Sequence, residues 1–215
     1  MDFERARKPE QKQIRINQIK EATLTIFETT PYHEITLAKI AGKLNFTRAN
    51  LYKYISSKEE IFLEIVLDEI NKLISDLENN KNRLNKEDLS SNAKIWAEVT
   101  EKHVLFLQLL SFMNTVLEQN ASIEKLIYFK NRLAVSLKNY SKTVSVFFPS
   151  LSETDRMVFL QMHNAFITGL YPNSNPSQMQ RQATEDSTLD YKFPNFTNTL
   201  TQFIVFTVEG LTRQA

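Results

Sequence analysis

Apolar residues recur at helical spacing along most of this chain. Within residues 11–27, Ile16, Ile19 and Phe27 fall on one side of a helix, and Pro31 ends the pattern. A repeat with this period indicates an amphipathic helix that turns one face toward a core.

Two shorter helical patterns follow, separated by a break that contains no Gly or Pro. Thr36 is placed to cap a helix over 37–44, and Thr47 is placed to cap a second helix over 48–54. Asn45 falls in the turn between them and tolerates the left-handed backbone that such turns often need. Helices this short are marginal alone, so we expect a tightly packed unit.

A long helix is expected next, because Ser57 and Glu60 form the S-x-x-E pattern of a capping box. Apolar positions keep this helix amphipathic to about residue 80. Residues 172–192 are expected to form a long loop. Helix is expected between the polar connection 78–92 and the break at 118–122, and its part 103–113 is expected to be buried. Three further helices are expected at 122–147, 152–170 and 195–212. The fold class is therefore all-α.

Composition narrows the class of protein. The 215 residues are 42% hydrophobic and 24% charged, with three Gly and no Cys. These values are usual for a globular helical protein, and without Cys there is neither a disulfide framework nor a thiolate metal site. No apolar run approaches the roughly 18 residues of a membrane span. We expect a cytoplasmic protein with no membrane partner and no cofactor.

The charge is distributed unevenly although its sum is only +1. Residues 1–60 carry 11 Lys and Arg against 8 Asp and Glu, whereas residues 61–215 carry 15 against 17. The asymmetry has the sign expected if the N-terminal part meets an anion.

The second short helix presents groups that suit DNA. At 100° per residue, Leu51 points inward while Ala49 and Lys53 point away from the core. Asn pairs with adenine, Arg with guanine, and Ala contacts the methyl group of thymine. The pattern alone also fits the solvated face of a small helical bundle. The candidate DNA-contacting residues are Thr36, Thr47, Arg48, Ala49, Asn50, Tyr52, Lys53, Tyr54 and Lys58.

The segment "ITLAKIAGKLNFTRANLYKYISSKEEIF" closely resembles the N-terminal DNA-binding domain of the TetR family of transcriptional regulators. Leu44 replaces a small residue of the family pattern, Asn45 replaces the turn Gly, and Ile55 replaces a Phe. The resemblance covers about residues 10–62, and beyond them it is only architectural. The matching residues are Thr36, Ile40, Ala41, Phe46, Thr47, Leu51, Tyr52, Tyr54, Ser57, Lys58 and Glu59.

The resemblance implies a three-helix DNA-binding domain over residues 1–56 and a larger helical effector-binding and dimerisation domain over 57–215. It also implies a homodimer that binds a palindromic operator as a repressor and is released by a small-molecule effector. The family dimerises through its last two long helices. Residues expected on that surface are Phe159, Leu170, Phe196, Leu200, Phe203, Ile204 and Val208.

The effector site is poorly marked in the sequence. Aromatic residues, Met and His in the middle helices suit a largely apolar effector, although residues at this spacing are more often simply core. The candidate ligand-binding residues are Trp96, His103, Phe106, Phe112, Met113, Phe129, Met162, His163 and Phe166.

The sequence offers little support for two other classes of protein. No catalytic motif is present and the three His lie far apart, so we expect neither an enzyme nor a metal site; the best metal set would be His103, His163 and Glu98. A helical adaptor with a vestigial DNA-binding domain is the main alternative. Arg48, Lys53 and Lys58 argue against it, because a retired DNA face has little reason to keep its cations.

Overall fold

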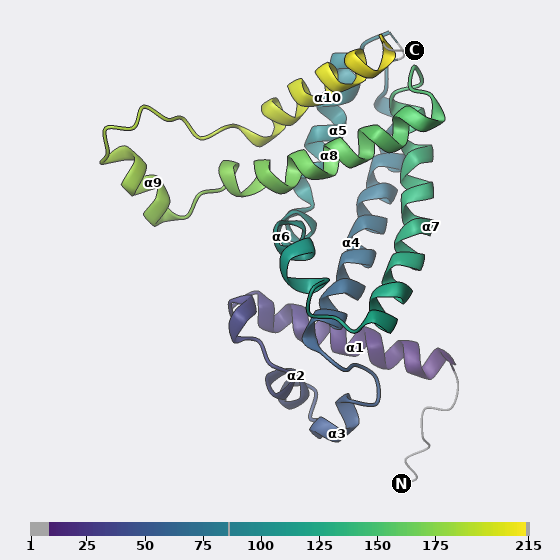
Figure 1. Cartoon of the computed structure of the whole chain (residues 1–215), viewed down its shortest axis with the longest axis vertical. Coiled ribbons are helices and arrows are strands. Elements are labelled where there is room, and N and C mark those ends of the chain that lie inside the picture. The colour runs from purple at the N-terminus through teal and green to yellow at the C-terminus, as the bar shows by residue number, and fades with distance from the viewer. Residues whose placement is uncertain (1–8, 86, 214–215) are drawn as a thin grey trace. The chain divides into compact units, whose positions relative to one another are not determined.

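The computed structural model describes residues 9–85 and 87–213, and within these ranges every regular element is a helix (Figure 1). The expected all-α class is confirmed. The chain divides into two compact units: the first runs to Val66 and includes Met113–Phe129, and the second consists of Leu67–Phe112 and the segment from Lys130 onward. No described helix has both the length and the apolarity needed to cross a membrane.

The first unit is built on α1 (Pro9–Phe27), α2 (Leu37–Lys43) and α3 (Arg48–Leu51), with α1 packed on α2 and α2 on α3. It also contains the beginning of α4 (Lys58–Asn79) and the beginning of α7 (Ile123–Phe147). A 3-10 turn at Tyr32–Glu34 and a π-helical turn at Met113–Leu117 complete it.

Edge-to-face contacts between aromatic rings stabilise the core of the first unit. The ring of Phe62 is fully buried and meets Phe27 and Tyr32 edge to face, with centroids 5.3 Å and 5.2 Å away. Ile19 and Ile40 are fully buried too, which confirms the apolar faces expected for α1 and α2. The short helices are therefore held by their neighbours, as their length requires.

The second unit contains α5 (Leu89–Lys102), α6 (Val104–Phe112), α8 (Glu153–Ser174), α9 (Gln178–Glu185) and α10 (Phe196–Thr212), with the rest of α4 and α7. Helix α10 packs along α5 and α8, and α8 also packs on α6. A 3-10 turn at Lys81–Arg83 follows α4. The predicted buried helix at 103–113 and the predicted C-terminal helix are both observed, as α6 and α10.

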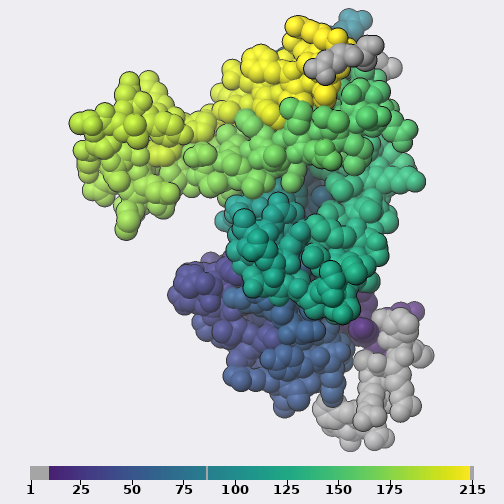
Figure 2. Space-filling model, viewed as in Figure 1, coloured from purple at the N-terminus to yellow at the C-terminus, as the bar shows by residue number. Residues whose placement is uncertain are grey.

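The loop expected over 172–192 is partly wrong. Helix α8 continues past Pro172 to Ser174, because the side chains of Asn173 and Ser174 donate to the carbonyls of Gly169 and Leu170 in the last turn. Helix α9 then begins at a capping box in which Ser177 and Gln180 bond reciprocally. No residue of α9 is buried, and Figure 2 shows this yellow-green segment standing clear of α8 and α10.

The expected domain boundary falls between residues 56 and 57. The compact units divide the chain between Val66 and Leu67, inside α4, and the first unit takes in Met113–Phe129. The domain boundary stays a prediction. Residues 1–8 of the expected N-terminal domain lie outside the described residues.

Candidate nucleic-acid interface and ligand cavity

The turn between α2 and α3 uses Asn45 in the left-handed conformation, with φ 54°. Among the described non-glycine residues it is the only one with a positive φ. The Phe46 amide donates to the carbonyl of Ala41 at 2.9 Å and closes the end of α2. The turn therefore works without the Gly of the family pattern, because Asn tolerates this conformation better than most residues.

Side-chain caps fix where the two helices of this motif begin. The hydroxyl of Thr36 accepts from the Lys39 amide at 3.2 Å, and that of Thr47 accepts from the Asn50 amide at 3.1 Å. Both predicted caps are confirmed. Each one satisfies an amide that the first helical turn would otherwise leave open.

The cap of α4 differs in detail from the predicted box. The Ser57 hydroxyl accepts from the Glu60 amide at 3.3 Å, as expected. The Glu60 carboxylate, however, accepts from the amide of Ser56 through Oε2 at 2.9 Å, one residue before the predicted partner. Glu60 thus ties the start of α4 to the chain that leaves α3.

The predicted orientation of α3 agrees with the structure. Leu51 is fully buried and Ile55 is buried, whereas Arg48, Ala49, Tyr52 and Lys53 are exposed. Asn50 and Tyr54 are half-buried. Small, amide, phenol and cationic groups thus stand together on one solvent-facing surface. That these groups contact DNA remains a prediction.

The helix itself is shorter than predicted. It ends at Leu51, and the amides of Lys53 and Tyr54 donate to carbonyls three residues earlier, at Asn50 and Leu51. Such bonds tighten the final turn toward a 3-10 geometry. The predicted helix through Tyr54 is therefore wrong, and after Leu51 the chain continues in hydrogen-bonded turns.

Lys58 is engaged within the unit. Its ammonium donates to the carbonyl of Tyr32 at 2.9 Å and lies 4.2 Å from the centroid of the Tyr32 ring. The Tyr32 hydroxyl in turn donates to Glu59 at 2.8 Å. Burial, reinforced by Glu59, raises the pKa of the Tyr32 phenol. Lys58, a predicted phosphate contact, is thus already committed to an internal partner.

Two of the predicted ligand-binding residues meet in a packed aromatic cluster of the second unit. Trp96 is fully buried, stacks on Tyr140 at 5.5 Å, and donates from Nε1 to Nε2 of His163 at 3.1 Å. Burial lowers the pKa of His163 to about 3, so its ring is neutral with the proton on Nδ1. The aromatic cluster comprises Trp96, Tyr140, Phe147, Phe148, Phe159 and His163.

The other predicted ligand-binding residues are spread over both units. Phe106, Met113 and Phe129 are buried, Phe112 is half-buried, and Met162 is exposed. The rings of Phe166 and Phe203 stack with centroids 3.9 Å apart. His103 is paired through Nε2 with Asp76 at 3.1 Å. The structure thus brings Trp96 and His163 together but does not gather the whole set.

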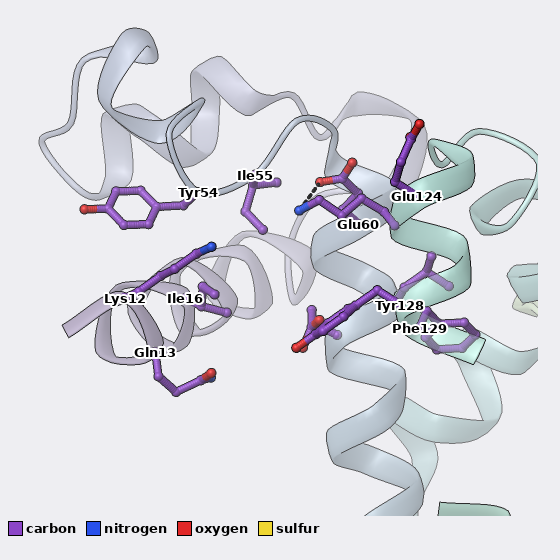
Figure 3. A pocket seen from close by; sticks show the side chains of 12 residues that line it. Lys12, Gln13, Ile16, Tyr54, Ile55, Glu60, Glu124, Tyr128 and Phe129 are labelled. Carbon is purple, nitrogen blue, oxygen red and sulfur yellow. Dashed lines mark ion pairs between the residues drawn. The ribbon is translucent and has the colours of Figure 1, made fainter. Parts of the chain in front are cut away.

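A cavity of about 440 Å³ lies in the first unit (Figure 3). Its walls come from the start of α1, the segment after α3, the start of α4 and the start of α7. The predicted ligand residue Phe129 lines it, as does the predicted DNA residue Tyr54. The lining residues are Lys12, Gln13, Ile16, Tyr54, Ile55, Glu60, Leu63, Glu64, Glu124, Lys125, Tyr128 and Phe129.

Comparison with known proteins decides the family. Residues 19–65 match "Bacterial regulatory proteins, tetR family", and residues 67–215, more than half of the chain, match "Tetracyclin repressor-like, C-terminal domain". The chain belongs to the TetR family. Members of this family are DNA-binding transcriptional regulators, so the expected family and general function are confirmed. No curated protein matches the chain as a relative.

Comparison with solved structures finds similar chains. The fatty acid degradation regulator FadR from Bacillus halodurans is 15% identical, with a TM-score of 0.50 and 97% of each chain covered. A TetR/AcrR-family regulator from Thermobifida fusca is 18% identical, with a TM-score of 0.49, covering 92% of this chain and 98% of that one. The TetR-family regulator PfmR from Thermus thermophilus is 19% identical, with a TM-score of 0.48, covering 90% and 98%.

Most of the residues predicted for a TetR-type dimer surface are buried within one chain. Phe203 is half-buried, and the other six are buried in the core of the second unit. The apolar side chains that α8 and α10 leave open are instead Met157, Met162 and Phe206. A two-helix dimer surface in this TetR-family chain would therefore be made mainly by residues that the sequence pattern did not select.

The alternative metal set is not assembled. Nε2 of His163 is occupied by Trp96, and Nε2 of His103 by Asp76. Glu98 pairs with Arg83 at 3.2 Å. Within residues 9–85 and 87–213, no group of three or more His, Asp or Glu is placed to hold a metal ion.

Proposed function

We propose that this TetR-family protein is a cytoplasmic repressor that binds a palindromic operator as a homodimer and is released by a small-molecule effector. The observation that supports this most is the solvent-facing surface of Arg48, Ala49, Tyr52 and Lys53 on a helix capped by Thr47. Its groups match those that read base edges and phosphates in the major groove.

Each residue of this surface is given a role by its chemistry. Arg48 and Asn50 are the proposed base readers, because Arg is suited to guanine and Asn to adenine. Lys53 and Tyr52 are proposed to bind phosphates, which position the protein without reading sequence. The caps at Thr36 and Thr47 hold the two helix starts at which further phosphate contacts are expected.

The proposed dimer uses the surface of α8 and α10. Phe206 is 70% exposed on α10, and Met157 and Met162 are exposed on α8, which packs on α10. Phe and Met are enriched in protein interfaces relative to the rest of the surface. A two-fold dimer would present two copies of α3 to two half-sites of one operator.

Release by an effector requires that the effector bind one state of the dimer better than the other. The largely apolar effector expected from the sequence stays a prediction. Trp96 and His163, two of its candidate residues, are packed against each other and against aromatic neighbours.

The proposal is tested by selecting binding sites from random duplex DNA with the purified protein. A palindrome bound at nanomolar strength by a dimer is the expected result. Enrichment of no sequence, together with salt-independent capture of a protein partner, would favour the adaptor function instead. A protein carrying Arg48→Ala and Lys53→Ala serves as the control, because both side chains are exposed and lie outside the core.

A further inference from the structure

The cavity of the first unit contains a buried acid whose charge is incompletely matched. Glu60 is only 4% exposed. Its Oε2 accepts from the Ser56 amide at 2.9 Å and lies 3.5 Å from Nζ of Lys125. The dashed line at Glu60 in Figure 3 marks this ion pair. Its Oε1 is shielded from solvent and has no hydrogen-bond partner among the described residues. An unsatisfied oxygen on a buried carboxylate costs free energy that a further donor would recover.

The ammonium group that now faces Glu60 can be displaced. Three carboxylates line the cavity, from Glu60, Glu64 and Glu124, against the two ammonium groups of Lys12 and Lys125. The Lys125 side chain is 42% exposed, so it can turn out to solvent at low cost. The ammonium that now neutralises Glu60 is therefore replaceable.

The rest of the lining suits an apolar body. Ile16, Leu63 and Phe129 supply aliphatic and aromatic surface, and Tyr54 and Tyr128 supply two further rings. Aromatic faces also attract organic cations. The volume of about 440 Å³ lies within the range of cavities that bind small molecules.

We propose that this cavity binds a small amphipathic organic cation, whose ammonium or guanidinium group takes the place of Lys125 beside Glu60. The apolar part of the ligand lies against Ile16, Tyr128 and Phe129. An ammonium or guanidinium carries several N–H donors, so the ligand can serve Oε1 as well as Oε2 once the Glu60 carboxylate turns toward the cavity.

The cavity is placed to influence DNA binding. Tyr54 and Ile55 line it, and the Ser56 amide is held by Glu60. These three residues directly follow the exposed surface of α3. A ligand that rearranges Glu60 therefore shifts the segment that positions Tyr52 and Lys53. This consequence, unlike the binding itself, rests on the proposed function.

The test is isothermal titration calorimetry of the full chain, without DNA, using 4-phenylbutylammonium as the probe. The neutral 4-phenylbutanol and the anionic 4-phenylbutyrate are matched in size and serve as controls. Saturable binding of the cation, at least tenfold tighter than that of either control, is the expected result. Absence of saturable binding, or preference for the anion, would overturn the proposal; the second outcome would assign the cavity to Lys12 and Lys125.

Two variants separate the ligand contact from folding. Glu60→Gln should weaken cation binding at least tenfold, whereas Lys125→Met should strengthen it severalfold by removing the competing ammonium. Glu69→Gln is the matched control, because Glu69 is also a buried acid on α4 but lies outside the cavity and is paired with Lys72. Unchanged affinity in both cavity variants would contradict the assignment. Since no DNA is present, this failure is distinct from a failure to bind an operator.

Discussion

Two buried polar groups of the aromatic cluster differ in whether they have a partner. Nε2 of His163 accepts from Trp96, whereas the Tyr140 hydroxyl has no hydrogen-bond partner among the described residues. Burial depresses the pKa of the His and raises that of the phenol, because both charged forms lose solvation. We therefore expect His163 to make the stability of the protein depend on pH, and we expect removal of the Tyr140 hydroxyl not to lower stability.

The His163 side chain should make the protein sensitive to acid. Its pKa falls from 6.5 in the unfolded chain to about 3 in the folded one, so the unfolded state takes up the proton first. The stability contributed by the neutral His163 declines as the pH falls from 6.5 toward 3, by roughly 1 kcal/mol at pH 5.5. Urea unfolding at a series of pH values measures this loss.

A matched pair of variants isolates the His163 contribution to acid sensitivity. His163→Gln should flatten the decline between pH 6.5 and pH 5, whereas His33→Gln should leave it unchanged, because the His33 side chain is 79% exposed. Equal slopes for the wild type and His163→Gln would show that His163 is not buried as a neutral base.

Tyr140→Phe should not destabilise the protein. The substitution removes a buried hydroxyl that has no partner among the described residues and keeps the ring that stacks on Trp96. The free energy of unfolding is expected to stay constant or rise by up to about 1 kcal/mol. Trp96→Phe, in contrast, leaves Nε2 of His163 unpaired and should cost about 1–3 kcal/mol. Destabilisation by Tyr140→Phe would indicate that the hydroxyl has a bound partner.

At the scale of elements, helix beginnings follow local sequence more closely than helix ends. Thr36, Thr47 and Ser152 each cap the helix that the sequence predicts after them. Helix α3 ends where the amides of Lys53 and Tyr54 donate to carbonyls three residues earlier, and the end of α8 depends on side chains that bond to its last carbonyls. Such contacts leave no periodic signal. The capping box of α9 is visible in the sequence as Ser177 and Gln180, but the Pro- and Asn-rich composition of the segment obscured it.

The two candidate sites also differ in how far the sequence predicts them. The exposed surface of α3 could be predicted because the residues of one short helix share a single period. The cavity could not, because its walls come from four segments, and Glu60 meets Lys125 from a distant part of the sequence. From the sequence, Glu60 was identifiable only as a capping residue.

The turn between α2 and α3 offers a test at this scale. Asn45 has φ 54°, which costs an ordinary L-residue roughly 1–2 kcal/mol. Asn45→Ala should therefore lower the free energy of unfolding by about 1 kcal/mol, whereas Asn45→Gly should leave it nearly unchanged. Thermal or urea unfolding of both variants measures the difference. A tolerated Ala would mean that the turn does not hold the left-handed conformation.

At the scale of the whole molecule, the proposed repressor requires a second copy of the chain. The exposed apolar residues on α8 and α10 supply the proposed contact surface. Phe206→Glu should convert the dimer to a monomer in light-scattering measurements. Val135→Glu places the same charge on another exposed apolar position, on α7, and should leave the dimer intact. Dimers in both variants would place the interface elsewhere.

The most direct test of DNA binding through α3 is the salt dependence of binding to the selected DNA duplex. Removing one phosphate contact should reduce the slope of log K against log salt concentration by about 0.9. In a dimer, Lys53→Ala removes one such contact from each protomer, so the slope should become less steep by about two while the preferred sequence stays the same. An unchanged slope, or a changed sequence preference, would contradict the role of α3 as the DNA-binding element with Lys53 on phosphate.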